Sequence, residues 1–488
     1  MLFAVVAASK ATAGAVRLGQ SDGDLIAHVT VGERILATGA IPNVSLASYT
    51  AASDPFIAHA WLSEIIMAWT FRLGGLPLLA VLTAVIIGLT HALVVVFLRR
   101  RGADPRWALL AGLLSLALGA SHWLTRPHMF SILGALLTIL LLEGRPRNRP
   151  LLFAALFAVW ANLHGAWLFG LLLIATYAAG EFLEYRLTGE ASHRTNAWDH
   201  ARAFGVASVA TLLNPYGPRL HLEVAEAVTS PLLSENIAEY LSPNFHEITN
   251  LPFLLGLVVV VGVLALSPRR MPFPWLLVLL VSLFFGLRSF RNIALFGVTA
   301  WPLVALHAAR SWSGRDWDPP LFRHFARIDA RTRAGPWSAA AAVVLLAIGL
   351  NHGRVAGVGI IPDQLDRTRF PVEAVERARA AGMTGRVFHP WVWGGYLLRE
   401  WPEVRIHVDP LEFNATTIDS YTLIDGLRPG WQAELDRWSV STALVRADAP
   451  LAAELRKAPG WQQWHADETA IVFVRQDSAT VGPALPAP

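Results

Sequence analysis

Residues 76–98 read LPLLAVLTAVIIGLTHALVVVFL, an apolar run without Asp, Glu, Lys or Arg. A helix rises 1.5 Å per residue, so a run of this length crosses a hydrocarbon core about 30 Å thick. With the N-terminal stretch Met1–Leu18, the apolar stretches of the chain predict an all-α membrane domain of about 11 transmembrane helices, the shorter of which need flanking residues to span. The other stretches are Trp107–Leu124, Met129–Leu142, Leu151–Ala161, Trp167–Leu183, Ala203–Leu213, Leu251–Leu266, Pro274–Leu287, Ile293–Ala308 and Trp337–Leu350.

The composition of the chain also indicates a membrane protein. Of its 488 residues, 54% are hydrophobic and 16% are charged, whereas an ordinary soluble domain carries about 25% charge. The sequence contains no cysteine, which excludes disulfides, thiol catalysis and thiolate metal sites. The formal net charge of +4 arises mostly from arginines in short loops. It therefore reports on membrane topology, and no nucleic-acid partner is expected.

The arginines lie in alternate loops, and their distribution predicts the sides of the membrane. Short loops rich in Lys and Arg stay cytoplasmic. The five basic loops share one face only if the segment His59–Gly74 does not cross the bilayer. This segment is instead predicted to be an amphipathic helix on the outer surface, with Trp61, Leu62, Ile65, Ile66 and Trp69 on one side and with Glu64 and Arg72 elsewhere. The basic loops contain Arg99, Arg100, Arg101 and Arg106; Arg145, Arg147 and Arg149; Arg186, Arg194 and Arg202; Arg269 and Arg270; and Arg310, Arg315, Arg323, Arg327, Arg331 and Arg333.

The chain divides into a transmembrane domain over residues 1–353, with an outer loop one at 19–74, and a soluble α/β domain over 362–480. An odd number of spans places the soluble domain on the outer side, and residues 481–488 are predicted to be a frayed tail. The predicted helices of the soluble domain are Glu373–Ala381 and Leu451–Lys457, and its predicted strands are Arg386–Phe388, Val404–Val408 and Ala470–Val474.

The soluble domain contains seven tryptophans, which permit two interpretations. Exposed tryptophans could stack on sugar faces, but large aromatic side chains in a small domain usually form its core, and the core is the favoured interpretation. The residues are Trp391, Trp393, Trp401, Trp431, Trp438, Trp461 and Trp464.

Loop one begins with two carboxylates and an imidazole within seven residues. Asp22, Asp24 and His28 follow directly after a predicted membrane helix, where they could supply a general base or hard metal ligands beside the bilayer. The alternative is structural, because Asp-Gly-Asp is also a common turn sequence. In that case Asp24 would cap a helix over Leu25–Leu36.

Other polar residues cluster in the short outer turns, although the charge rule predicts few arginines there. Arg126 and His128 lie in one turn, and Arg288 and Arg291 lie in another. Guanidinium groups match the oxygens of a phosphate, and an imidazole could donate one more hydrogen bond. The alternatives are arginines that reach for the interface and, for His164, an ordinary loop or core histidine.

The predicted spans contain no carboxylate at mid-depth, and His91 is the central titratable group. Ion-coupled transporters usually carry intramembrane carboxylates along their pathway. This pattern favours a surface active site that is fed by a lipid-anchored substrate over a transporter.

Several motifs of the chain resemble those of a group of bacterial polytopic membrane proteins in the GT-C glycosyltransferase superfamily. The resemblance covers nearly the whole sequence. In that group an Asp usually follows the loop-one Pro and an Arg follows the tail Asp; here Ser45 and Leu411 occupy those places. The motifs are Asp22-Gly-Asp24, His28, Gly32, Ile35, Gly39, Pro42, Ser48-Tyr49-Thr50, His59-Ala-Trp61-Leu62-Ser63-Glu64, Gly74-Gly75, Arg126-Pro127-His128, Asn162-Leu-His164-Gly165, Asn214-Pro-Tyr216-Gly217, Arg288 to Asn292, Trp393-Gly394-Gly395-Tyr396-Leu397 and Val408-Asp409.

The superfamily includes oligosaccharyltransferases, protein O-mannosyltransferases and aminoarabinose transferases. The resemblance implies an inverting transferase that takes a polyprenyl-phosphate-linked sugar from the membrane and uses it at the outer face of the bacterial inner membrane. It also implies an essential Asp in loop one, which here is Asp24 or Asp22.

The remaining roles follow from the chemistry of the side chains. Arg126, His128, Arg288 and Arg291 would hold the lipid phosphate, and His28, His59, Glu64 and His164 would position substrate. In an alternative version, Asp22, Asp24 and Glu64 bind Mg²⁺ or Mn²⁺. Two further readings are a scaffold that keeps the fold without transfer and a transporter of lipid-linked sugars.

Overall fold

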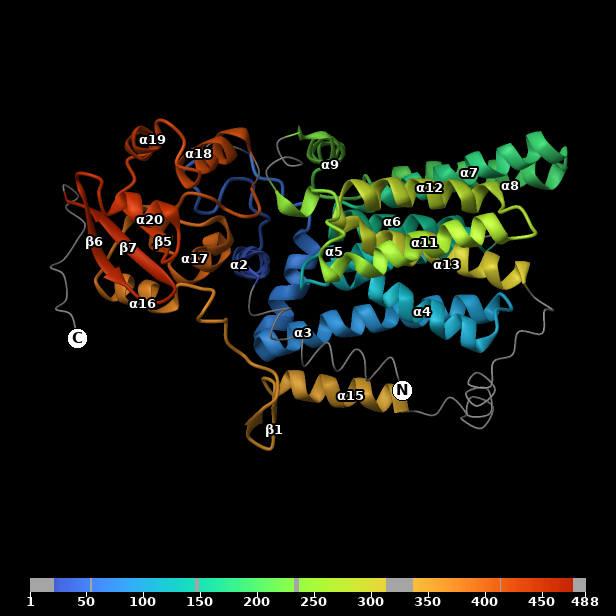
Figure 1. Ribbon diagram of the computed structural model, residues 1–488, viewed down its shortest axis with the longest axis horizontal. Helices are drawn as coiled ribbons and strands as arrows, with labels where there is room; N and C mark the ends of the chain where they lie inside the picture. Colours follow the sequence, from blue (N-terminus) through green and yellow to red (C-terminus); the bar gives the residue numbers. More distant parts are fainter. Residues whose placement is uncertain are drawn as a thin grey trace. The chain divides into compact units, whose positions relative to one another are not determined.

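The computed structural model describes residues 22–52, 55–144, 149–231, 237–312, 337–412 and 414–476. These residues form two compact units (Figure 1). The helical unit includes Val81–Ala347, and the mixed unit includes the residues up to Ala80 and from Ile348 onward. The structure therefore groups loop one with the tail, whereas the predicted division placed it in the membrane domain. The predicted Met1–Leu18 span and the frayed tail 481–488 lie outside the described residues, as does the part of the fifth basic loop from residue 313 to 336.

The helices of the helical unit follow the predicted apolar stretches within a few residues. The exception is the helix expected at Ala203, which begins at Ala191 and includes a polar first half. The elements are α3 (Trp61–Arg100, shared with the mixed unit), α4 (Pro105–Gly119), η1 (Ala120–His122), α5 (His128–Leu142), α6 (Pro150–Leu163), α7 (Trp167–Thr188), α8 (Ala191–Ala210), α9 (Arg219–Thr229), η3 (Ala238–Tyr240), η4 (Ile248–Asn250), α11 (Leu251–Leu266), α12 (Phe273–Arg288), η5 (Phe290–Asn292), α13 (Ile293–Ser311) and α15 (Trp337–Leu350).

Four helical stretches of the described chain are long and apolar enough to cross a membrane by length and composition: Trp61–Arg100, Trp167–Thr188, Ile248–Leu266 and Phe290–Ser311. Five shorter apolar helices accompany them among the described residues. The chain is accordingly a multi-pass membrane protein, and the count of about 11 spans stays a prediction.

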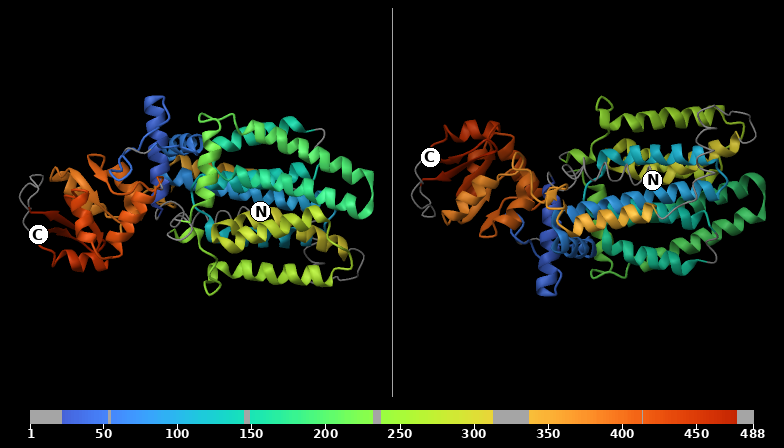
Figure 2. Two further views of the ribbon diagram at one scale, coloured as in Figure 1. Left: turned by 90° about the horizontal axis from the view of Figure 1, so that it is seen from above. Right: turned by 90° about the horizontal axis from the view of Figure 1, so that it is seen from below.

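Helix α13 is the centre of the helical unit. Nearly all of its residues are buried, and it packs against α4, α5, α11 and α12. Figures 1 and 2 show these helices lying side by side. The contact with α4 is fixed by hydrogen bonds from Ser115 Oγ to the carbonyl of Gly297, at 2.6 Å, and from Trp301 Nε1 to the carbonyl of Ala111, at 2.9 Å. A polar side chain that donates to a facing helix holds two membrane helices in register.

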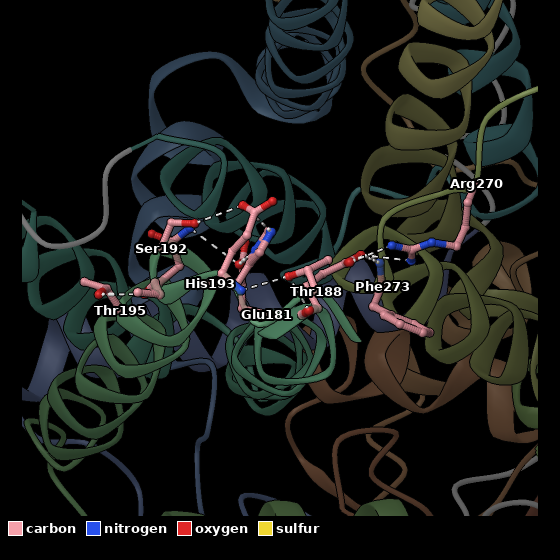
Figure 3. A network of polar contacts seen from close by, with 11 residues as sticks. Glu181, Thr188, Ser192, His193, Thr195, Arg270 and Phe273 are labelled. Atoms are coloured by element: carbon pink, nitrogen blue, oxygen red, sulfur yellow. Dashed lines mark hydrogen bonds and ion pairs between the residues drawn. The ribbon is translucent and has the colours of Figure 1, made fainter. Parts of the chain in front are cut away.

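A network of charged residues joins the ends of α7, α8 and α12 (Figure 3). The carboxylate of Glu184 accepts two hydrogen bonds from Arg270, at 2.6 and 3.0 Å, and one from the backbone N–H of Phe273, at 2.7 Å. Glu181 lies 2.7 Å from His193 Nδ1 across the α7–α8 turn. The Glu184 carboxylate thus accepts a hydrogen bond from the N–H of Phe273, a backbone donor at the start of α12 that has no partner within the helix.

A second carboxylate, Glu143, connects the loop after α3 with α5, α7 and α12. It pairs with Arg101 at 3.1 Å and accepts hydrogen bonds from the Tyr177 hydroxyl at 2.9 Å and from Trp275 Nε1 at 2.7 Å. The Arg101–Glu143 and Arg270–Glu184 pairs bring two of the basic loops to one end of the helical unit, as the alternation of arginines predicts. The side of the membrane on which they lie stays a prediction.

Helix α3 consists of two helices that meet at a kink. Gly74 and Gly75 have non-helical backbone angles, and Gly75 has a φ of 63°, which favours glycine. The Asp363 carboxylate accepts the backbone N–H of Leu76 at 3.0 Å and lies 2.7 Å from His352 Nδ1, so it caps the apolar helix from outside. Residues 61–73 therefore precede the span as a separate helix, as the sequence predicts.

The buried side of this separate helix differs from the predicted one. Glu64, Met67 and Ala68 are buried, whereas Trp69 is 51% exposed. The reason is a close approach to α2 (Gly23–Thr38), in which a Cβ at Gly32 would lie 2.0 Å from the Glu64 carbonyl oxygen. Glu64 therefore belongs to the buried side of this helix, whereas the side that was predicted to be apolar carries the exposed Trp69.

The mixed unit is built on a five-stranded sheet with the order β4-β3-β5-β7-β6. Strand β3 runs parallel to β4 and β5, and β7 runs antiparallel to β5 and β6. The predicted helices and strands of the tail are confirmed with small differences at their ends. The bounds are α16 (Val372–Ala380), β3 (Gly385–Phe388), η6 (Trp391–Trp393), α17 (Gly394–Glu400), β4 (Val404–Ile406), α18 (Ala415–Asp425), α19 (Trp431–Arg437), β5 (Thr442–Arg446), α20 (Pro450–Leu455), β6 (Trp461–Ala466) and β7 (Ala470–Arg475), with a separate hairpin of β1 (Arg354–Val355) and β2 (Val358–Gly359).

Six of the seven tryptophans of the tail belong to the core of the mixed unit or pack against it, all except Trp391. Trp393 and Trp401 are each 1% exposed, and Trp461 is 9% exposed. The other four are partly buried. The core interpretation of these residues is therefore confirmed.

Loop one is part of the same fold. Ser48 forms a parallel bridge with Ile406 at the edge strand β4, and the Tyr49 hydroxyl lies 2.7 Å from His407 Nδ1. Helix α2 packs on α17 so closely that a Cβ at Gly395 would lie 2.1 Å from the Gly23 carbonyl oxygen. The Ser48-Tyr49-Thr50 and Gly394-Gly395 motifs therefore dock loop one on the tail.

Candidate functional site

The two loop-one aspartates lie at the start of α2. Asp22 is the N-cap residue: its Oδ1 accepts the backbone N–H of Asp24 at 3.2 Å, and the residue is 5% exposed. Asp24 lies in the first turn and is partly exposed. The alternative in which Asp24 caps a helix from Leu25 is therefore wrong, because Asp22 caps a helix that begins two residues earlier. Asp24 has the more accessible carboxylate of the two.

His28 and Glu64 form a buried pair between α2 and the first part of α3. His28 Nδ1 lies 3.0 Å from Glu64 Oε1, and Glu64 is 2% exposed. Burial raises the pKa of Glu64 to about 8, and the nearby His59 opposes this rise. His28 and Glu64 are thus brought together in the interior of the mixed unit, with the partly exposed His59 nearby, and their role in substrate positioning stays a prediction.

Asp409 is a further member of this cluster that the candidate list from sequence did not contain. It is 1% exposed, and its Oδ1 accepts the backbone N–H of Leu411 at 3.0 Å. Burial, with a smaller contribution from the negative charge of Glu64, raises the pKa of Asp409 to about 6. The Val408-Asp409 motif is the signal in the sequence that could have identified it.

The buried Glu64 predicts a pH dependence of stability. Since its pKa is about 8 in the folded protein against an ordinary value of 4.5, the folded state binds more protons than the unfolded state between these values. The free energy of unfolding should therefore fall as the pH rises through this window. In E64Q this contribution is absent, so we expect a flatter profile and, at about pH 8.5, a stability on the order of 1 kcal/mol or more above wild type.

Unfolding of detergent-solubilised protein from about pH 5 to about pH 8.5 measures this effect. The matched control is E468Q, because Glu468 is an exposed carboxylate of the same unit. An E64Q profile that stays parallel to that of wild type would contradict the assignment.

The proposed metal ligands do not form one set. Among the described residues, no group of three or more His, Asp or Glu side chains lies in an arrangement that could hold a metal ion. Asp22 is engaged as a helix cap, and Glu64 is paired with His28. The binding of Mg²⁺ or Mn²⁺ by Asp22, Asp24 and Glu64 stays a prediction.

Two of the predicted arginines converge in the helical unit. Arg126 Nη1 lies 3.0 Å from Oε1 of Glu239, and Arg291 Nη1 lies 4.0 Å from Oε2 of the same carboxylate. Glu239 belongs to η3 and was not predicted from the sequence. Arg288, the last residue of α12, is exposed. The structure thus brings Arg126 and Arg291 to one carboxylate, that of Glu239. Arg288 does not belong to this pair of contacts.

Histidines lie next to this pair. His128 Nε2 lies 3.0 Å from the carbonyl oxygen of His122, and the two ring centroids are 4.6 Å apart. His122 was not predicted from the sequence.

His164 has a structural environment. Its Nδ1 lies 2.8 Å from Ser131 Oγ, which also accepts a hydrogen bond from Trp160 Nε1 at 2.8 Å. This network joins the end of α6 to α5. The interpretation of His164 as a packing histidine is therefore favoured over a role with substrate.

Comparisons with known proteins define the class of fold. No family model and no curated protein matches the chain. Solved structures do match it. The oligosaccharyltransferase of Archaeoglobus fulgidus in its apo form is 13% identical with a TM-score of 0.57, over 98% of this chain and 74% of that one. The AglB oligosaccharyltransferase of the same organism, in complex with an inhibitory peptide and a dolichol-phosphate, is 12% identical with a TM-score of 0.54, over 96% and 71%.

The third structure is ArnT from Cupriavidus metallidurans bound to undecaprenyl phosphate. It is 15% identical with a TM-score of 0.52, over 99% of this chain and 98% of that one. The chain therefore shares the fold of these oligosaccharyltransferase and ArnT structures, and the predicted resemblance is confirmed as a likeness of fold. At this level of identity the comparison establishes the fold and leaves donor and acceptor open.

Proposed function

We propose that the protein transfers a sugar from a polyprenyl-phosphate-linked donor to an acceptor at the outer face of the bacterial inner membrane, with inversion at the anomeric carbon. The observation that supports this proposal most directly is the convergence of Arg126 and Arg291 on one carboxylate. Two guanidinium groups arranged around an anion of two oxygens suit a phosphate group equally well. Solved structures of the same fold contain dolichol-phosphate or undecaprenyl phosphate.

In the proposed reaction Asp24 is the general base. The acceptor hydroxyl gives its proton to the Asp24 carboxylate while its oxygen attacks the anomeric carbon, and the bond from that carbon to the phosphate oxygen breaks. Asp24 is preferred over Asp22 because Asp22 is occupied as the cap of α2. The products are the glycosylated acceptor and the polyprenyl phosphate.

Arg126 and Arg291 bind the phosphate and stabilise the negative charge that grows on it as the leaving group. Fixed donors that face a developing charge lower the barrier because they need no rearrangement during the reaction. His128 borders this pair through His122 and shapes the site. A dependence on Mg²⁺ or Mn²⁺ is not required by these roles.

A scaffold without transfer activity is the second candidate, and Ser45 is the residue that favours it. The Ser45 hydroxyl accepts the backbone N–H of Ser48 at 3.1 Å and thus stabilises a turn at the place where the resembling proteins carry an acidic residue. Transport receives less support, since His91 lies between two backbone carbonyls, those of Ile87 at 2.8 Å and Ser115 at 3.3 Å. This arrangement explains His91 by helix packing.

The proposal is tested with the full-length protein in lipid nanodiscs. A panel of polyprenyl-phosphate-linked sugars is offered together with extracted envelope glycans and peptides, and release of free polyprenyl phosphate is measured. We expect release that depends on the protein and on one sugar. Binding of the lipid without release from any donor in the panel would favour the scaffold.

A further inference from the structure

Glu239 occupies the arginine pair in the way a ligand would. Each of its two carboxylate oxygens faces a different guanidinium, Arg126 at 3.0 Å and Arg291 at 4.0 Å. The three side chains are 19% to 24% exposed, so they are partly withdrawn from water while they remain accessible. In this environment an ion pair is stronger than on an open surface, and an anion that arrives from outside has to replace it.

The backbone holds Glu239 in this position independently of its carboxylate. Ser289 Oγ donates to the carbonyl oxygen of Glu239 at 2.7 Å, and the N–H of Phe290 donates to the carbonyl oxygen of Leu241 at 3.0 Å. The Arg291 guanidinium also lies 4.8 Å from the centre of the Tyr240 ring. Removal of the carboxylate therefore leaves the segment 239–241 attached to the loop after α12.

The charges at this place favour competition between Glu239 and a phosphate. Two guanidinium groups and one carboxylate leave one net positive charge, which attracts a phosphate less than the two charges of the arginines alone. An internal anion that occupies a site for part of the time lowers the affinity of the site for its ligand. The apparent affinity is the intrinsic affinity multiplied by the fraction of time for which the site is open.

We propose that Glu239 is an internal counter-anion that the phosphate of the lipid must displace from Arg126 and Arg291. This inference rests on the proposed role of the two arginines in phosphate binding. It assigns Glu239 a function in the proposed reaction cycle. Glu239 weakens the hold on the spent polyprenyl phosphate and returns to the arginines when that product leaves.

The inference is tested by the affinity of the full-length protein for undecaprenyl phosphate in detergent. We expect E239Q to bind the lipid at least about fivefold more tightly than wild type. The matched control is E247Q, since Glu247 is an exposed residue of the same connection and accepts a hydrogen bond from Asn244 at 3.4 Å. This control should bind as wild type does.

Two other results have separate meanings. If R126Q binds the lipid as tightly as wild type, the arginine pair is not the phosphate site, and the proposed function loses its main support. If R126Q binds weakly and E239Q binds no more tightly than wild type, the arginines do hold the phosphate. In that case Glu239 merely orients them and the inference is wrong.

Discussion

In D24N, sugar transfer is expected to fall by at least about 100-fold, because asparagine cannot accept the proton of the acceptor hydroxyl. The fold should be kept, since Asp24 is a partly exposed residue of the first turn of α2 and does not cap that helix. The measurement is the rate of polyprenyl phosphate release, with thermal unfolding of the same preparation.

D22N separates the two loop-one aspartates. Asparagine caps a helix as well as aspartate does, so D22N keeps the start of α2 and removes only the charge. We expect D22N to retain more activity than D24N, and the reverse order would make Asp22 the base. The matched control is D104N, which changes the exposed cap of α4. Full activity in both D22N and D24N would show that neither loop-one aspartate is the general base.

R126Q and R291Q are each expected to lower transfer about 100-fold, the usual effect of removing one donor that stabilises a developing negative charge. Both variants should also bind undecaprenyl phosphate more weakly. Glutamine keeps part of the length and polarity of arginine while it removes the charge. The loss is therefore attributed to the phosphate contact and not to packing.

R219Q is the matched control for this pair, because Arg219 is an exposed residue at the start of α9 in the same unit. Its activity should equal that of wild type. If R126Q and R291Q transfer sugar as fast as R219Q, the leaving group is stabilised elsewhere. R288Q then becomes the next variant to test, since Arg288 is exposed at the end of α12.

The elements of the fold were accessible from the sequence because they depend on neighbouring residues. The apolar stretches Leu251–Leu266 and Trp337–Leu350 coincide with α11 and α15. The strand at Ala470 and the helix that begins at Pro450 are likewise marked by local pattern and by proline. The GT-C resemblance also came from motifs, and the solved structures confirm it as a likeness of fold.

The partners of the polar side chains depended on contacts between distant parts of the chain. Arg126 meets Glu239 across 113 positions, and Ser48 meets His407 across 359, so no local pattern could identify these pairs. The same holds for Glu64, which the sequence placed only away from the apolar side of its helix. Its burial results from the contact with Gly32 on another helix.

The sequence by itself determined that this chain is a multi-pass membrane protein with a mixed α/β tail, because hydropathy and periodicity are properties of consecutive residues. Only the tertiary structure decided that loop one folds with the tail, that Asp22 is a cap, and that Glu239 lies between two arginines. Each of these depends on which side chains the packing of separate helices brings within hydrogen-bonding distance, and that packing is a property of the whole fold.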